Sequence, residues 1–255
     1  MPIDTHSFTW LTAFLLTLAR VGGVFTFVPI PGFKQAPDLI KVVLSVLVTI
    51  ALYPAWPKWT GPLPSEGFLV VLVMSEAALG ITIGLAVRFI EEALLLSSQM
   101  VGLQAGYSFA STIDPSSQAD SSVLQVLASL MASLLFFAFR LHEQVIRSLA
   151  QSLISHPPGQ VFSMSTSAEP LIRLGSTIFS AGLRLAFPVV ALLMFIDISL
   201  ALLGRLNAQL QLLSLSFPVK MLVALAVLSM TGAAIPLIYQ GTAMQNLGFV
   251  MRSMR

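Results

Sequence analysis

The side chains that could do chemistry in this sequence are few, and they do not form a catalytic pattern. There is no cysteine, and the three histidines lie far apart at positions 6, 142 and 156. The sequence contains no HExxH zinc-binding pattern, no GxSxG nucleophile turn and no glycine-rich phosphate loop. These absences predict a protein that is not an enzyme and that uses neither a metal nor an organic cofactor.

The charged residues carry a different signal, because several of them interrupt long apolar segments. A charged side chain at the centre of a membrane helix costs about 2.5–3.5 kcal/mol on an insertion scale. We therefore expect protein or a water-filled cavity beside these residues, although Arg20 and Lys220 could instead reach the membrane surface from helix ends. The residues that we expect to be buried in an assembly are Arg20, Glu76, Arg88, Arg184 and Asp197.

Composition indicates why those segments are read as membrane helices. Of 255 residues, 56% are hydrophobic and only 9% are charged, with a net charge of +2. A soluble protein of this length needs more polar surface, since about a quarter of the residues of soluble domains are charged. The composition also excludes a disordered chain, a basic nucleic-acid binder and a disulfide-stapled secreted domain.

The apolar segments predict an all-α integral membrane protein with about six spans. A span needs roughly 20 apolar residues. Residues 107–122 are small and polar and predict a loop, and residues 140–155 predict an amphipathic helix. The expected spans are Phe8–Pro29, Leu39–Tyr53, Gly67–Phe89, Val123–Phe139, Leu171–Leu203 and Leu212–Tyr239.

Prolines and glycines predict how these spans are shaped and packed. Pro29, Pro188, Pro218 and Pro236 predict kinks, which are tolerated in a membrane when neighbours satisfy the freed carbonyl groups. Two GxxxG patterns, at positions 80 and 84 and at positions 102 and 106, favour close contacts between helices, although such patterns also arise by chance. Glu76 and Arg88 lie about 18 Å apart along one helix, so each needs a partner elsewhere.

Three blocks of residues follow one another along the chain in a distinctive order. They are Arg20-Val21-Gly22-Gly23 near the start, the block from Met100 to Ser108 followed by Asp114-Pro115, and Phe217-Pro218-Val219-Lys220. In this order they resemble the FliR/SctT family of the bacterial type III protein-export gate. The middle block is the most specific, since it is similar to the family pattern G-x-Q-x-G…D-P; the first resembles the family's opening pattern and the last its F-P-x-K block. The likeness covers about residues 10–240, and the flagellar branch is nearer than the injectisome branch.

The resemblance implies a fold of kinked helical hairpins within a multi-subunit assembly. It implies one membrane-embedded domain over 1–255, in which about 1–200 resembles the larger gate subunit and about 200–255 the small hairpin subunit. It also implies several copies each of two smaller membrane subunits, FliP-like and FliQ-like, as partners in the bacterial inner membrane, at the flagellar basal body. Unfolded flagellar proteins would be the substrates, with energy supplied by partners.

The resemblance also implies roles for two groups of residues. Residues 107–122 would lie in the channel and plug it when closed. The residues of this plug region are Gly102, Gln104, Gly106, Tyr107, Phe109, Asp114 and Pro115. A second group would contact an FlhB-like subunit that switches export specificity, or would simply anchor the chain at the membrane surface. It comprises Arg205, Gln209, Phe217, Pro218 and Lys220.

Other classes of membrane protein remain open at this point. A secondary transporter or channel for a small solute also has broken spans and buried charges. An injectisome homologue or a purely structural assembly factor would share the same composition. Co-purification with several copies of two smaller membrane subunits would favour the export gate over a transporter.

Overall fold

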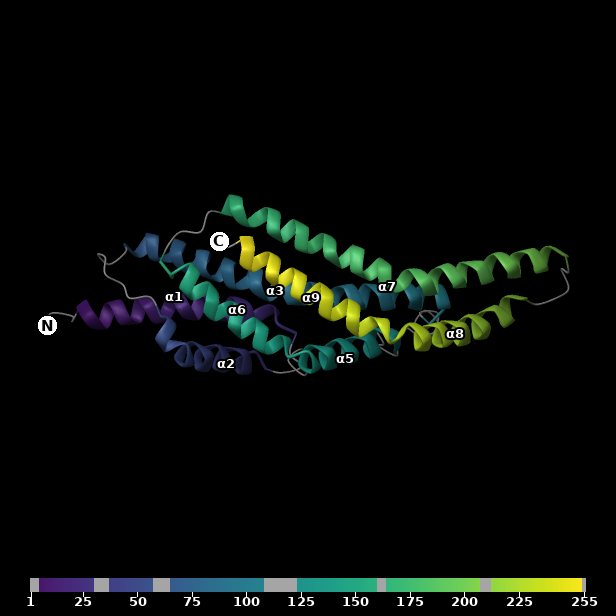
Figure 1. The fold of residues 1–255 in the computed structure, drawn as a ribbon, viewed down its shortest axis with the longest axis horizontal. Coiled ribbons are helices and arrows are strands. Elements are labelled where there is room, and N and C mark those ends of the chain that lie inside the picture. The colour runs from purple at the N-terminus through teal and green to yellow at the C-terminus, as the bar shows by residue number, and fades with distance from the viewer. Residues whose placement is uncertain are drawn as a thin grey trace. The chain divides into compact units, whose positions relative to one another are not determined.

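The computed structural model describes residues 5–29, 37–56, 65–107, 123–159, 164–206 and 212–253, and these are helical almost throughout (Figure 1). The described ranges contain no strand, which confirms the expected all-α class. The helices are α1 (Thr5–Phe27), α2 (Asp38–Ala51), the short 3₁₀ helix η1 (Tyr53–Ala55), α3 (Glu66–Ala105), α5 (Val123–Ala138), α6 (Leu141–Ser155), α7 (Met164–Leu206), α8 (Leu212–Thr231) and α9 (Ala234–Ser253).

Three to five of these elements are long and apolar enough to cross a membrane, fewer than the six expected. Thr9–Phe27, Glu66–Ala105 and Ile172–Arg205 qualify alone. The pairs α5–α6 and α8–α9 each qualify only as one bent span, with bends of 62° and 61°. With 14 residues, α2 is about 21 Å long, which is shorter than the hydrocarbon core of about 30 Å.

The two sharp bends have different local causes. Between α5 and α6, Arg140 adopts a left-handed conformation with φ 53°, which a regular helix cannot contain. Between α8 and α9, the break comes just before Pro236, which lies in the first turn of α9, where its missing N–H is tolerated. Pro188 and Pro218 lie inside α7 and α8, and neither helix is interrupted there.

The contacts divide the chain into two compact units, each assembled from separate segments. The first comprises Met1–Phe89, Phe136–Gly175 and Ala243–Arg255, and the second comprises Ile90–Leu135 and Ser176–Thr242. In the second unit, a buried core joins α3, α5, α7 and α8. Its members are Val101, Ala105, Leu124, Ala186, Val189, Leu193 and Ala224. The division at about residue 200 that the family resemblance implies stays a prediction.

In the first unit, glycines let α1 and α3 approach at the distance of backbone contact. A Cβ atom added at Gly80 would lie 2.0 Å from the Arg20 carbonyl oxygen, and one at Gly84 would lie 2.7 Å from the Val24 carbonyl oxygen. On the opposing helix, a Cβ at Gly23 would lie 2.5 Å from the Ala77 carbonyl oxygen. The expected helix contact at Gly80 and Gly84 is therefore confirmed, and its partner is α1.

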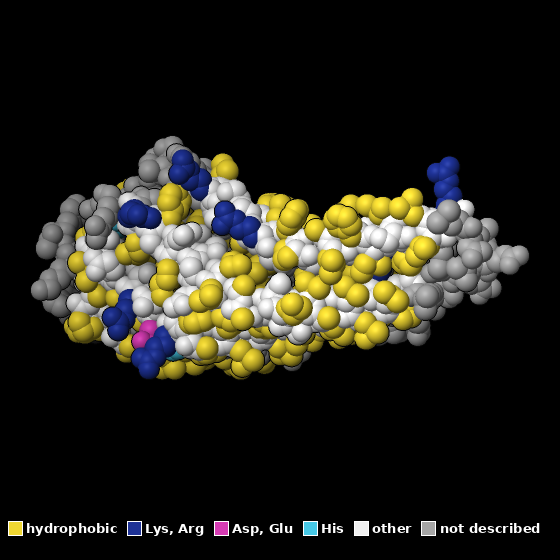
Figure 2. Space-filling view, turned by 45° about the vertical axis from the view of Figure 1, so that its right-hand side comes forward, with side chains coloured by type: hydrophobic (Ala, Val, Ile, Leu, Met, Phe, Trp, Pro, Cys, Tyr) yellow, Lys and Arg dark blue, Asp and Glu magenta, His cyan; other side chains and the backbone are white. Residues whose placement is uncertain are grey.

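Polar and apolar side chains are placed as expected for a chain with apolar surroundings. Hydroxyl groups within helices bond to carbonyl oxygens of their own helix, as Thr17 does to Ala13 and Thr49 to Ser45. The only buried residues of α2 are Ser45 and Thr49, and most of its apolar side chains are exposed. Hydrophobic side chains cover much of the visible surface in Figure 2.

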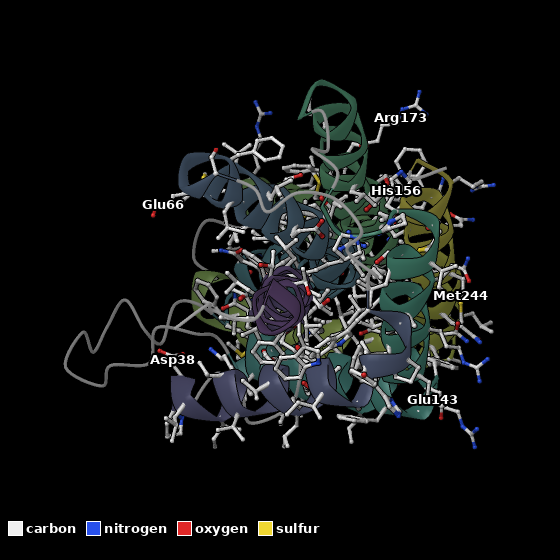
Figure 3. The ribbon with its side chains drawn as sticks, turned by 90° about the vertical axis from the view of Figure 1, so that its left-hand side faces the viewer. Asp38, Glu66, Glu143, His156, Arg173 and Met244 are labelled. Atoms are coloured by element: carbon white, nitrogen blue, oxygen red, sulfur yellow. The ribbon has the colours of Figure 1, made fainter. Side chains whose placement is uncertain are left out.

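The amphipathic helix expected at 140–155 is confirmed as α6. Its buried residues, Leu141, Val145, Leu149, Ser152 and Leu153, recur at the spacing of one helical face. Figure 3 shows Asp38, Glu66, Glu143 and Arg173 at the edge of the first unit, with His156, which follows α6, lying inside them.

The close contact of α1 and α3 predicts different effects for two adjacent glycines. Gly23→Ala should destabilise the chain by about 1–3 kcal/mol, because its Cβ meets backbone that cannot rotate away. Gly22→Ala is the matched control, since nothing lies within 4 Å of its Cβ and alanine favours a helix. The measurement is the midpoint temperature at which the detergent-extracted chain aggregates. Equal midpoints for both variants would contradict the close contact.

Candidate functional site

Two groups of charged and polar side chains, one in each unit, bring together several of the residues that the sequence singled out. In the first unit, Arg20 on α1 and Glu76 on α3 form an ion pair, with 2.6 Å between Arg20 Nε and Glu76 Oε2. Both side chains are 1% exposed. Arg20 therefore does not reach the surface from a helix end, which was the alternative reading of its position.

Backbone groups at the end of α6 complete the surroundings of this pair. Arg20 Nη1 donates to the Ser152 carbonyl oxygen at 2.8 Å, and Arg20 Nη2 donates to the His156 carbonyl oxygen at 3.0 Å. The second carboxylate oxygen, Glu76 Oε1, accepts a hydrogen bond from the Gly159 N–H at 3.1 Å. We call these five residues the Arg20 network.

The Arg20 network offsets part of the electrostatic cost of two charges within apolar helices. A buried charge is tolerated when it is paired and its remaining hydrogen-bonding positions are filled. Here all three guanidinium nitrogens donate and both carboxylate oxygens accept. The network also fixes α1, α3 and the end of α6 to one another, because each supplies part of it.

In the second unit, Asp197 on α7 joins α3 and α8. Asp197 Oδ1 lies 2.5 Å from Lys220 Nζ, and Asp197 Oδ2 accepts a hydrogen bond from Gln104 Nε2 at 2.8 Å. The Lys220 side chain is 13% exposed and that of Asp197 is 39% exposed. We call Gln104, Asp197 and Lys220 the Asp197 cluster. It unites one residue from each of the three groups predicted from sequence.

The chain leaves α3 through a turn that is held against α8. Gly106 has φ +88°, and a Cβ added there would lie 2.6 Å from the Phe217 ring. Only glycine fits this position without strain, because both the backbone conformation and the space exclude a side chain. Tyr107 then donates a hydrogen bond to the Met221 carbonyl oxygen at 3.2 Å. Burial raises the pKa of the Tyr107 phenol, so the hydroxyl stays protonated as a donor.

The remaining predicted residues lie in varied positions. Gly102 is buried, Arg88 is half-buried, and Arg184, Arg205 and Pro218 are exposed on this chain. Burial of Arg184 by other subunits, and contact of the 205–220 group with a partner, stay predictions. The predicted residues outside the described ranges are Phe109, Asp114, Pro115 and Gln209.

Several residues of these two groups could not be identified from the sequence. Ser152, His156 and Gly159 take part in the Arg20 network mainly through backbone atoms, which carry no sequence signal. Glu91 is 2% exposed and was not singled out, although a carboxylate within an apolar helix is itself such a signal. Among the described residues, no group of three or more His, Cys, Asp or Glu side chains could hold a metal ion.

Neutralising one side of the Arg20 network should destabilise the chain strongly. Glu76→Gln leaves the buried guanidinium without a counter-charge, which costs about 3–5 kcal/mol. Arg20→Lys should also destabilise the chain, because a single ammonium group cannot donate to the three acceptors that the planar guanidinium group reaches. The measurement is the amount of chain that remains in the membrane and resists protease.

The matched control for this prediction is Glu66→Gln, at the exposed start of the same helix. The double variant Arg20→Met with Glu76→Met should recover part of the lost stability, since replacing a whole buried pair by apolar side chains is often neutral. Equal protease resistance of Glu76→Gln and Glu66→Gln would show that the ion pair does not hold the unit together.

Comparisons with known proteins agree with the motifs. Residues 11–245 match the family described as bacterial export proteins, family 1. The chain is 31% identical over 230 residues to flagellar biosynthetic protein FliR of Escherichia coli K12, covering 90% of this chain and 87% of that protein. It is 30% identical to the protein of the same name from Pectobacterium carotovorum, covering 90% and 86% of the two chains.

A more distant relative shows that the similarity extends along the chain. Flagellar biosynthetic protein FliR of Bacillus subtilis is 23% identical over 219 residues, covering 85% of this chain and 84% of that protein. The matched range of the family includes the Arg20 network and the Asp197 cluster. The chain therefore belongs to the bacterial export proteins of family 1, together with the FliR proteins of these bacteria.

Proposed function

We propose that this chain is a membrane component of the bacterial flagellar protein-export apparatus. In this proposal it lies in the inner membrane at the flagellar basal body, and it helps to form and plug the channel through which unfolded flagellar subunits pass. The names of its relatives, which describe flagellar biosynthesis, and the export-protein family support this assignment. Membership of that family disfavours a transporter for a small solute.

The proposed partners are several copies of FliP-like and FliQ-like subunits and an FlhB-like subunit. Exposed apolar side chains support such an assembly. On α2 alone, Leu39, Val42 and Leu47 are more than half exposed, although they lie within a helix too short to span a bilayer. Exposed apolar surface of this extent is covered by lipid or by other subunits. The injectisome branch is disfavoured because these relatives are named for the flagellum.

The observation that supports the plug proposal is the set of contacts made by residues 104–107, which come directly before residues 108–122. Gln104, Gly106 and Tyr107 lie immediately before this segment, and each contacts α7 or α8. A plug that opens and closes must be attached to a part of the protein that stays in place, which we call the root of the plug. The Asp197 cluster and the Gly106–Phe217 contact supply such a root, since they tie the end of α3 to two long helices.

Removing the plug should open the channel to ions. Deletion of Ser111–Asp120 should raise the conductance of the purified assembly in a planar bilayer, because the deleted residues no longer fill the pore. The double substitution Ser117→Ala with Gln118→Ala keeps the length of the segment and should stay closed. Unchanged conductance and unchanged secretion after the deletion would refute the plug. A deletion variant that no longer assembles into a complex would instead favour a purely structural assembly factor.

Releasing the root should open the channel only part of the time. Asp197→Asn leaves the Lys220 ammonium without its counter-charge, and losing one partner of a charged hydrogen bond costs about 1.5–3 kcal/mol. Detachment of the root should then become about 10–100 times more frequent. We expect brief openings in single-channel records, with a mean current below that of the deletion.

The matched control for the root is Asp38→Asn, which breaks the exposed ion pair with Lys41 and should leave the channel closed. The combined variant Asp197→Met with Lys220→Met tests for a fold defect, since it removes both charges together. Channel records of Asp197→Asn that match those of Asp38→Asn, at equal amounts of assembled complex, would contradict a role for the cluster in holding the root.

A further inference from the structure

The second unit contains a cavity that neither the proposed channel nor the proposed plug explains. Its volume is about 410 Å³, within the range of about 300–1,000 Å³ that is typical of small-ligand pockets. It is partly open, and α3, α5, α7, α8 and α9 all contribute to its wall. The bend between α8 and α9 lies at its edge, since Thr231, Gly232 and Ala234 line it.

The wall of this cavity is apolar, because most of its side chains are hydrocarbon and most of its hydroxyl groups are already hydrogen-bonded. Leucine, isoleucine, valine, alanine and methionine side chains form the larger part. Three of the hydroxyl groups in the wall are already used, because Ser98, Ser229 and Thr231 donate to carbonyl oxygens of their own helices. The wall therefore offers an occupant few positions for hydrogen bonding.

Among the described residues that line the cavity, Arg184 on α7 is the one with a charged side chain. It is exposed and lies within Ile172–Arg205, a helix apolar enough to span a membrane. Among the described residues it has no hydrogen bond or ion pair, unlike Arg20 and Lys220. A guanidinium within an apolar span requires an anionic partner or access to the headgroup region.

From this arrangement we propose that the cavity is a binding site for one anionic phospholipid. An acyl chain fills the apolar space, and the phosphate pairs with the guanidinium of Arg184, which presents several donors to an anion. An anionic phospholipid has both parts that this site would bind: a long apolar acyl chain for the cavity and a compact negative phosphate for Arg184. Basic side chains between membrane helices bind lipid headgroups by the same attraction.

Other occupants fit the wall less well. A partner helix packs through close backbone approach at small residues rather than by entering a cavity. An acidic side chain from a partner subunit could neutralise Arg184, but it would leave the apolar space empty, and empty apolar space forfeits packing contacts. A lipid satisfies the cation and the space together.

The test uses the purified membrane assembly, reconstituted with a photoactivatable phosphatidylglycerol or with the same probe carrying a zwitterionic phosphatidylcholine headgroup. The wild-type chain should be labelled by both probes, and more strongly by phosphatidylglycerol. Arg184→Gln should lower phosphatidylglycerol labelling about fivefold and phosphatidylcholine labelling by less, since the choline cation already offsets the charge of that lipid's phosphate. Arg147→Gln, on an exposed position of α6, is the matched control and should have no effect.

Two further variants test the acyl-chain part of the site. Ala128→Phe fills the cavity from α5 and should abolish labelling by both probes. If that variant does not assemble, Ser229→Phe narrows the cavity from an exposed position on α8 and should have the same effect. Labelling that is equal in wild type, Arg184→Gln and the cavity-filling variants would overturn the proposal. Labelling lost only on removal of a partner subunit would assign the cavity to that partner.

The outcome of this test is separate from that of the proposed function. Channel conductance and secretion report on the plug and its root, whereas probe labelling reports on the cavity alone. A chain that exports flagellar proteins and takes no lipid label would refute the lipid site without touching the export proposal.

Discussion

The ion pair between Arg20 and Glu76 is the interaction on which the first unit depends. Each charge would be expensive in an apolar helix, and neither could be tolerated without the other. The short glutamate side chain reaches its partner because Gly23, Gly80 and Gly84 allow α1 and α3 to touch through their backbones. The glycines and the ion pair are thus parts of one constraint, and the carbonyl oxygens at the end of α6 complete it.

The second unit also contains paired charges within apolar helices, but its Asp197 cluster is more exposed than the Arg20 network. Asp197 stands between Gln104 and Lys220, and it is partly exposed rather than enclosed. Such a cluster fixes the end of α3 while remaining within reach of water, which lowers the cost of rearranging it. The first unit therefore holds its charges in a fully buried network, and the second unit holds them in a partly exposed one.

Much of the helical architecture could be predicted from the lengths and the spacing of the apolar segments. Apolar length identified the helices, and the period of apolar residues identified the buried face of α6. The apolar segment that forms α2 has only 14 residues, so its length already argued against a separate span there. The left-handed turn at Arg140, by contrast, cannot be seen in apolar length. The sequence showed that Arg20 and Glu76 are charges within apolar helices and therefore need partners. It could not show that they pair with each other, since they lie 56 positions apart and their other partners are backbone groups.

That separation along the chain has a consequence for how the protein is made. Ribosomes add about 5–20 residues per second, so Glu76 follows Arg20 by between about 3 and 11 s, and Ser152 follows by between about 7 and 26 s. During this interval the nascent α1 carries a lone positive charge that its own neighbours cannot neutralise. The ion pair can therefore form only after α3 has been made, and its backbone partners after α6 follow later still, so this part of the fold closes late and over a long range of sequence.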